Sequence, residues 1–80
     1  MNLNSLAGLL REGGDFAGAR PLYERALQIF EQSLGSTHFL VGMSLNNLAL
    51  LYHALGDYAK AEPLFQRALV INEQALGPTR

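Results

Sequence analysis

The chain contains no cysteine, which excludes disulfide bonds and thiolate metal sites. A domain of 80 residues is usually only marginally stable without such help. The two histidines, His38 and His53, are too few for a structural metal site, and about four helical turns would separate them. We therefore expect no metal and no cofactor, and we expect partner chains to supply part of the stability.

Charge is also scarce. Charged residues make up 16% of the chain, against roughly 25% in an average soluble domain, and hydrophobic residues make up 49%. The formal net charge of −1 disfavours contacts with nucleic acid and with anionic membranes. No apolar run approaches the roughly 18 residues of a membrane span, and the first residues do not resemble a signal peptide. We expect a cytoplasmic chain that contacts other proteins.

An internal repeat is the strongest feature of the sequence. Residues 1–38 align with residues 43–80 at a constant offset of 42 without a gap, and 21 of the 38 pairs are identical. A fixed period of this length is typical of stacked supersecondary units. We take residues 1–80 as one domain, with repeat one at 1–38, a connector at 35–42 and repeat two at 43–80.

Each repeat is predicted to form two helices. Apolar residues recur at helical spacing, as at Tyr23, Ala26, Leu27 and Phe30. The pair Gly14-Asp15 is typical of a helix end followed by a helix start, and residues 56–57 repeat it. A second pair, Leu-Gly, ends each unit, and Pro78 prevents continuation of the last helix. The expected helices span residues 2–12, 16–34, 38–54 and 58–76.

Two prolines lie inside these expected helices. Pro21 and Pro63 fall about one and a half turns into the second helix of each unit, where proline removes a backbone donor. We expect a local kink at each. The alternative is a helix that begins later than residues 16 and 58.

The order of large and small residues in the second unit resembles the tetratricopeptide repeat. The matching residues are Leu48, Ala49, Tyr52, Gly56, Tyr58, Ala61, Phe65, Ala68 and Leu69. The 42-residue period, the segment Leu34-Gly35-Ser36-Thr37-His38 and the segment Leu45-Asn46-Asn47-Leu48-Ala49 are similar to the longer repeats of kinesin light chains. Phe39 stands where that type has proline, which leaves the start of the third helix open. The resemblance implies an all-α fold of two helix-turn-helix hairpins, stacked as a short right-handed solenoid.

The resemblance also implies a function, because the first helix of each unit lines a concave groove in this family. The groove positions that we single out as partner-binding are Asn4, Arg11, Asn46, Asn47, Leu50 and His53. An asparagine amide both donates and accepts hydrogen bonds, so it suits the backbone of an extended peptide. The alternative is that these asparagines bridge neighbouring helices or face water. Only Arg11 is permanently cationic, so we do not expect capture of an acidic chain terminus.

Catalysis is not expected. The serines lie in no nucleophile motif, and Gly13-Gly14 is not followed by the lysine of a phosphate-binding loop. A second function class is self-assembly. The segment 39–55 is apolar nearly all round, and two repeats are fewer than a stable stack usually needs. We therefore expect homo-oligomers, formed by end-to-end stacking or by exchange of hairpins, as the alternative to binding a foreign peptide.

Overall fold

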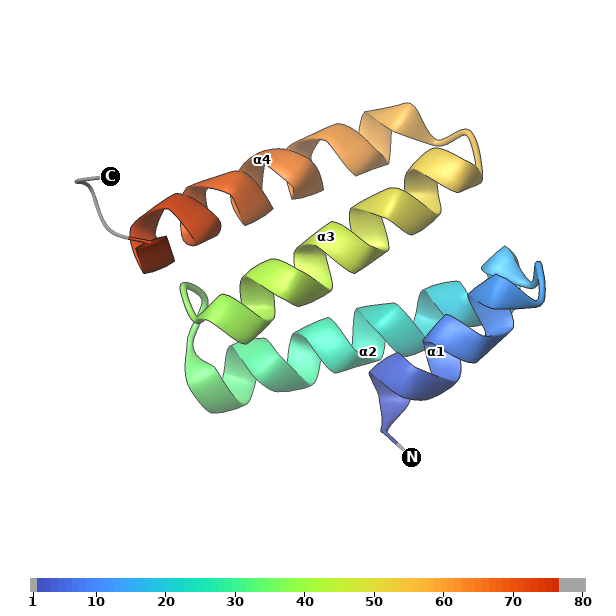
Figure 1. Ribbon diagram of the computed structural model, residues 1–80, viewed down its shortest axis with the longest axis horizontal. Helices are drawn as coiled ribbons and strands as arrows, with labels where there is room; N and C mark the ends of the chain where they lie inside the picture. Colours follow the sequence, from blue (N-terminus) through green and yellow to red (C-terminus); the bar gives the residue numbers. More distant parts are fainter. Residues whose placement is uncertain (1, 77–80) are drawn as a thin grey trace.

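The computed structural model describes residues 2–76 and consists of four helices that pack in adjacent pairs (Figure 1). Their bounds are α1 Leu3–Glu12, α2 Phe16–Leu34, α3 Phe39–Ala54 and α4 Tyr58–Leu76. The all-α prediction and the four expected helices are confirmed, each end within one residue. The predicted stop at Pro78 lies outside the described residues.

The two units turn in the same way. Gly14 and Gly56 have φ values of 90° and 84°, a left-handed conformation that glycine adopts without strain. After the first turn the amide of Asp15 donates to the carbonyl of Leu10 at 2.8 Å, and after the second the amide of Asp57 donates to that of Tyr52 at 2.9 Å. Both bonds satisfy carbonyls that the helix end leaves without a partner. The short turns make the helices of each pair antiparallel.

Side chains cap three helix starts. The Asp15 carboxylate accepts from the amide of Gly18 at 2.9 Å, as predicted. Asn2 caps α1 in the same way. The Nδ1 of His38 accepts from the amide of Leu40 at 3.0 Å, so α3 begins at Phe39 and not one residue earlier. His38 therefore caps α3 from within the connector.

Both prolines lie inside unbroken helices. The alternative that α2 or α4 begins later is therefore wrong, because tertiary packing on α1 and α3 holds the first turns in place. The local kink at Pro21 and Pro63 stays a prediction.

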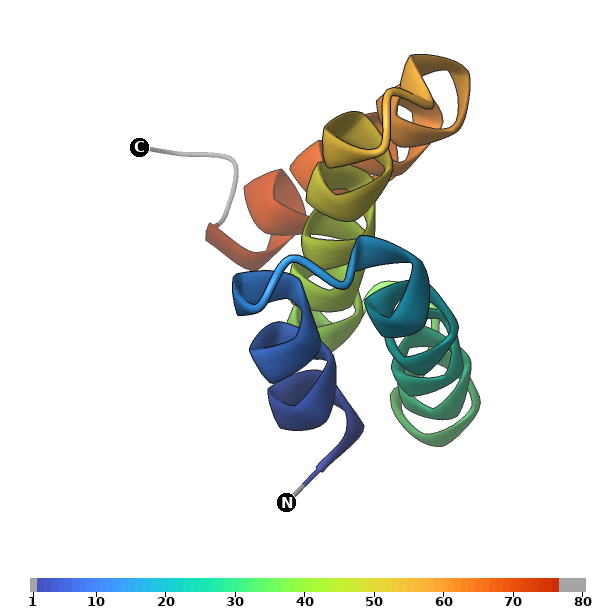
Figure 2. The same cartoon turned by 90° about the vertical axis from the view of Figure 1, so that its right-hand side faces the viewer.

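The third helix is the centre of the molecule. It packs against α2 on one side and α4 on the other, whereas α1 packs mainly against α2 (Figures 1 and 2). This arrangement accounts for the apolar composition of α3, whose fully enclosed side chains include Val41, Leu45 and Leu51. Gly42 permits close approach to α4, because a Cβ there would lie 2.9 Å from Cγ2 of Ile71. No helix in the part of the chain that the structure describes is long and apolar enough to cross a membrane.

Candidate protein-binding surface

The predicted partner-binding residues form two strips, one on α1 and one on α3. Residues four and then three positions apart lie on one face of a helix, so Asn46, Leu50 and His53 form a continuous strip on α3. Asn4 and Arg11 form the equivalent strip on α1, because each is 42 positions before a residue of the α3 strip. Both helices pack against α2, α3 also packs against α4, and contact between α1 and α3 is minor.

The α3 strip is open to solvent. Asn46 and His53 are exposed, Asn47 is half-buried, and Leu50 is 45% exposed. Exposure of Leu50 follows from the packing of α3, since α2 and α4 cover its other sides. His53 contacts the ring of Tyr58 edge-on, with centroids 4.8 Å apart, so its ring packs on the first residue of α4. The strip therefore offers an amide, a large apolar side chain and an imidazole in sequence.

The α1 strip is more enclosed. Asn4 and Arg11 are both half-buried. The Oδ1 atom of Asn4 is buried and accepts no hydrogen bond from any residue in the described range. It lies beside a hollow lined by Asn2, Leu3, Asn4, Ala26, Ile29 and Phe30. Because this acceptor atom is enclosed, the α1 strip is less accessible to a partner segment than the α3 strip.

On the other side of the molecule, polar contacts join the two units. The hydroxyl of Tyr52 donates to Oε2 of Glu24 at 2.6 Å, and Arg20 lies 4.0 Å from the same carboxylate. Burial raises the pKa of Tyr52 above its ordinary value, and the bond to Glu24 raises it further. The second contact is an ion pair at 3.0 Å between Arg67 on α4 and Glu31 on α2.

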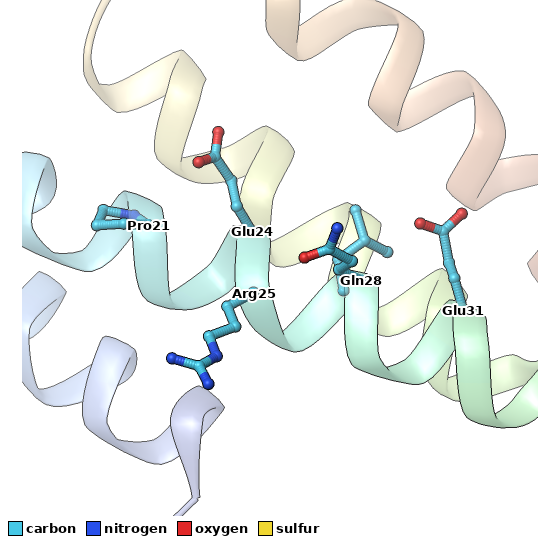
Figure 3. Close-up of a pocket in the computed structure, with 6 residues that line it drawn as sticks. Pro21, Glu24, Arg25, Gln28 and Glu31 are labelled. Carbon is cyan, nitrogen blue, oxygen red and sulfur yellow. The ribbon is translucent and has the colours of Figure 1, made fainter.

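The two glutamates of these contacts, Glu24 and Glu31, line a shallow hollow on α2 (Figure 3). Glu24 and Glu31 point toward α3 and α4, whereas Arg25 points the opposite way, toward α1. A second hollow is lined in part by Pro63, Gln66, Arg67 and Val70, which are the repeat equivalents of Pro21, Glu24, Arg25 and Gln28. The same surface feature thus recurs once per unit.

Sequence reasoning missed the exposed leucines at the two ends of the stack. Leu6 and Leu9 on α1 are 40% and 54% exposed, and Leu69 on α4 is 58% exposed. Their repeat equivalents are better covered: Leu48 and Leu51 are buried, and Leu27 is half-buried. Aligning the two copies would have paired these positions, but the difference in exposure appears only once the helices are packed.

The described residues contain no group of three or more acidic or histidine side chains that could hold a metal ion. None of the curated proteins compared with the chain matches it. One protein family does: its model, described as tetratricopeptide repeat, matches residues 1–76. That match covers both helical pairs, and the chain belongs to the tetratricopeptide repeat family.

Proposed function

We propose that the chain holds an extended segment of another protein across the exposed strips of α1 and α3, without catalysing a reaction. Tetratricopeptide repeats are in general protein–protein interaction modules. The observation that carries the proposal is the α3 strip, where Leu50 stays 45% exposed between Asn46 and His53. An exposed leucine flanked by polar groups is the usual make-up of a peptide-binding surface.

The chemistry of the two strips favours a neutral peptide backbone. Asn46, Asn47 and Asn4 offer amides that pair with backbone N–H and C=O groups whatever the peptide sequence. Leu50 offers contact area for one apolar side chain of the peptide. Arg11 and His53 occupy equivalent positions at the far end of each strip, and two such groups are too few to select a carboxylate terminus. The 42-residue period supports the further proposal that the repeats are of the long, kinesin-light-chain-like type.

The test is a selection of random ten-residue peptides, acetylated and amidated at their ends, on the immobilised chain. The affinity of the strongest binder is then measured by fluorescence anisotropy. Leu50→Ser is expected to weaken binding about tenfold, because the lost apolar contact is worth on the order of 1–2 kcal/mol. Leu69→Ser is the control, since Leu69 is an exposed leucine on α4, at 58% against 45% for Leu50, and lies outside both strips.

Two results would contradict this proposal. One is a binder that tolerates Leu50→Ser and Asn46→Ala but is lost with Leu69→Ser. The other is a clear rise in affinity when the selected peptide is remade with a free C-terminal carboxylate, which would assign the recognition to Arg11 and His53 instead of the asparagine amides.

Self-assembly is the second candidate function. It is favoured by the leucines at both ends of the stack. These leucines are exposed, whereas the leucines at the equivalent repeat positions between the two units are more buried. Stacking of ends and exchange of hairpins are the two possible routes, and they predict different assemblies. An end-to-end stack grows without limit, whereas a hairpin exchange closes at a dimer.

A further inference from the structure

We infer that copies of this chain stack head to tail, with α1 and α2 of one copy resting on α4 of the preceding copy, through a contact that repeats the one between the two units of a single chain. This inference deepens the second candidate function and rests on it. Each end of the stack is thus covered by another copy of the same chain. Because the repeat has no gap, each residue of this contact is found by shifting a residue of the internal contact by 42 positions.

The internal contact has an apolar part. Leu48 and Leu51 of α3 are 4% and 0% exposed and belong to one core cluster with residues of α1 and α2, against which Leu27 packs. Forty-two positions earlier, Leu6 and Leu9 have the equivalent partner helix within their own unit, but no unit precedes them in the described structure, and they are 40% and 54% exposed. The preceding unit therefore accounts for the difference.

The opposite end carries the complementary residue. Leu69 of α4 is the equivalent of Leu27, and it is 58% exposed because no unit follows it in the described structure. Placing a second copy by the same displacement brings its Leu6 and Leu9 onto Leu69 of the first. Leucines that are partly exposed in both separate copies would then share one contact, which is the apolar contribution to association.

The internal contact also contains an ion pair, and the contact between copies reproduces it. Arg67 pairs with Glu31 at 3.0 Å across the two units. Their equivalents are Arg25 and Glu73, both exposed, and within the described range neither makes an ion pair. Arg25 also points toward the α1 side of the molecule, where the preceding copy would lie (Figure 3). The displaced copy places its Arg25 against Glu73 of the first.

Two internal contacts are not reproduced, which limits the affinity. The equivalents of Tyr52 and Glu24 are Leu10 and Gln66, which cannot form the same hydrogen bond. Phe30 packs against the core cluster that contains Val41 and Leu45 of α3. Its equivalent in the second unit is the polar Asn72, which cannot make the same apolar contact. The external contact is therefore weaker than the internal one, and we place association in the micromolar to millimolar range of chain concentration.

The experiment measures molar mass by light scattering across that range. The wild-type mass is expected to rise past that of a dimer without a plateau, because a head-to-tail contact leaves both ends open. Arg25→Glu and Glu73→Arg each place like charges together, and each should raise the concentration needed for association about three- to tenfold. An equimolar mixture of the two variants restores opposite charges at every contact and should associate as the wild type does.

Glu12→Arg is the control, because it reverses one exposed charge that is not part of the proposed contact between copies. Leu9→Glu should abolish association, and helicity by circular dichroism verifies that each variant is folded. A wild-type monomer at every concentration overturns both this inference and self-assembly. A dimer that reaches a plateau and ignores both charge reversals overturns head-to-tail stacking alone and leaves hairpin exchange standing.

Discussion

Tyr52 shows at the scale of one residue how the two units are joined. Its ring is buried on α3, and its hydroxyl reaches back to Glu24 on α2 at 2.6 Å. The protonated hydroxyl is the form that donates this bond, and burial disfavours the ionised form. Both effects raise the pKa of Tyr52 above 10.0.

The first prediction follows from that pKa. Above pH 10 the tyrosine of the unfolded chain loses its proton while the folded chain retains it, so the stability contributed by Tyr52 is present below pH 10 and is lost as the pH rises through the raised value. Tyr52→Phe should cost about 1 kcal/mol at neutral pH. It should also make the loss of stability above pH 10 shallower than in the wild type, as measured by urea unfolding.

Tyr58 provides the control for the first prediction, because it is exposed and donates no hydrogen bond in the described structure. Tyr58→Phe also removes one tyrosine hydroxyl, so comparing the two variants isolates what the bond between Tyr52 and Glu24 contributes. Equal slopes for Tyr52→Phe and the wild type would show that Glu24 does not hold the Tyr52 proton.

The second prediction concerns two glycines in the first helix of each unit. A Cβ at Gly8 would lie 3.8 Å from the hydroxyl oxygen of Tyr23, an ordinary contact, whereas a Cβ at Gly42 would lie 2.9 Å from Ile71. Gly8→Ala should therefore stabilise the chain by about 0.5–1 kcal/mol through helix propensity. Gly42→Ala should not gain this stability, because the added methyl group would push α3 away from α4. Thermal unfolding of both variants tests the contrast, which equal shifts would contradict.

At the scale of the element, α2 and α4 are long helices that each contain a proline. Pro21 cannot donate to the carbonyl four residues earlier, yet α2 continues from Phe16 to Leu34. The helix persists because Ala19, Tyr23 and Ala26 are buried on the side that packs into the molecule. Packing therefore overrides a local penalty, as it often does for propensity.

The third prediction is that Pro21→Ala stabilises the chain by about 1–2 kcal/mol. Alanine restores the missing donor and the better helix propensity, and the greater freedom of the unfolded chain offsets part of this gain. Urea unfolding followed by helicity is the measurement. Pro63→Ala is the matched variant in α4 and should shift stability in the same direction. A loss of stability in both would mean that the prolines relieve strain instead of imposing it.

At the scale of the whole molecule, the position of a residue in the stack decides what its side chain does. Leu9 and Leu51 are the same residue type at the same place in their units, but one is 54% exposed and the other is fully buried. The buried leucine lies in the cluster shared by both units, so it contributes to their cohesion.

The fourth prediction uses this pair. Leu51→Ala should cost about 2–5 kcal/mol, through lost burial and the cavity left behind, which is most of the stability that a domain of this size has. Leu9→Ala should cost less than about 1 kcal/mol in dilute solution. Unfolding measured at low concentration keeps the contact between copies out of the comparison. Similar losses for both variants would show that the two units do not share a core.

The helix boundaries could be predicted from the sequence because their causes are local. Gly14 and Gly56 adopt a positive φ, and Asp15 and His38 accept from amides two or three residues away. The start of α3 was the exception: it was predicted at residue 38 with its exact position left open, and the capping contact of His38 places it at Phe39. The positions of the α3 strip came from the family resemblance, in which the first helix of each unit lines a groove, and Asn46, Leu50 and His53 are exposed in the structure.

The sequence by itself therefore determined the repeat, the four helices and their antiparallel pairing, since periodicity, glycine conformations and caps act within a few residues of one another. Only the tertiary structure decided which copy of an identical residue is buried, which carboxylate Tyr52 and Arg67 reach, and that the Oδ1 atom of Asn4 is enclosed. The physical reason is that burial and contacts between helices depend on how neighbouring units are displaced. Because the repeat has no gap, the two units have nearly the same local structure. Packing makes them differ, because the first unit covers one face of the second.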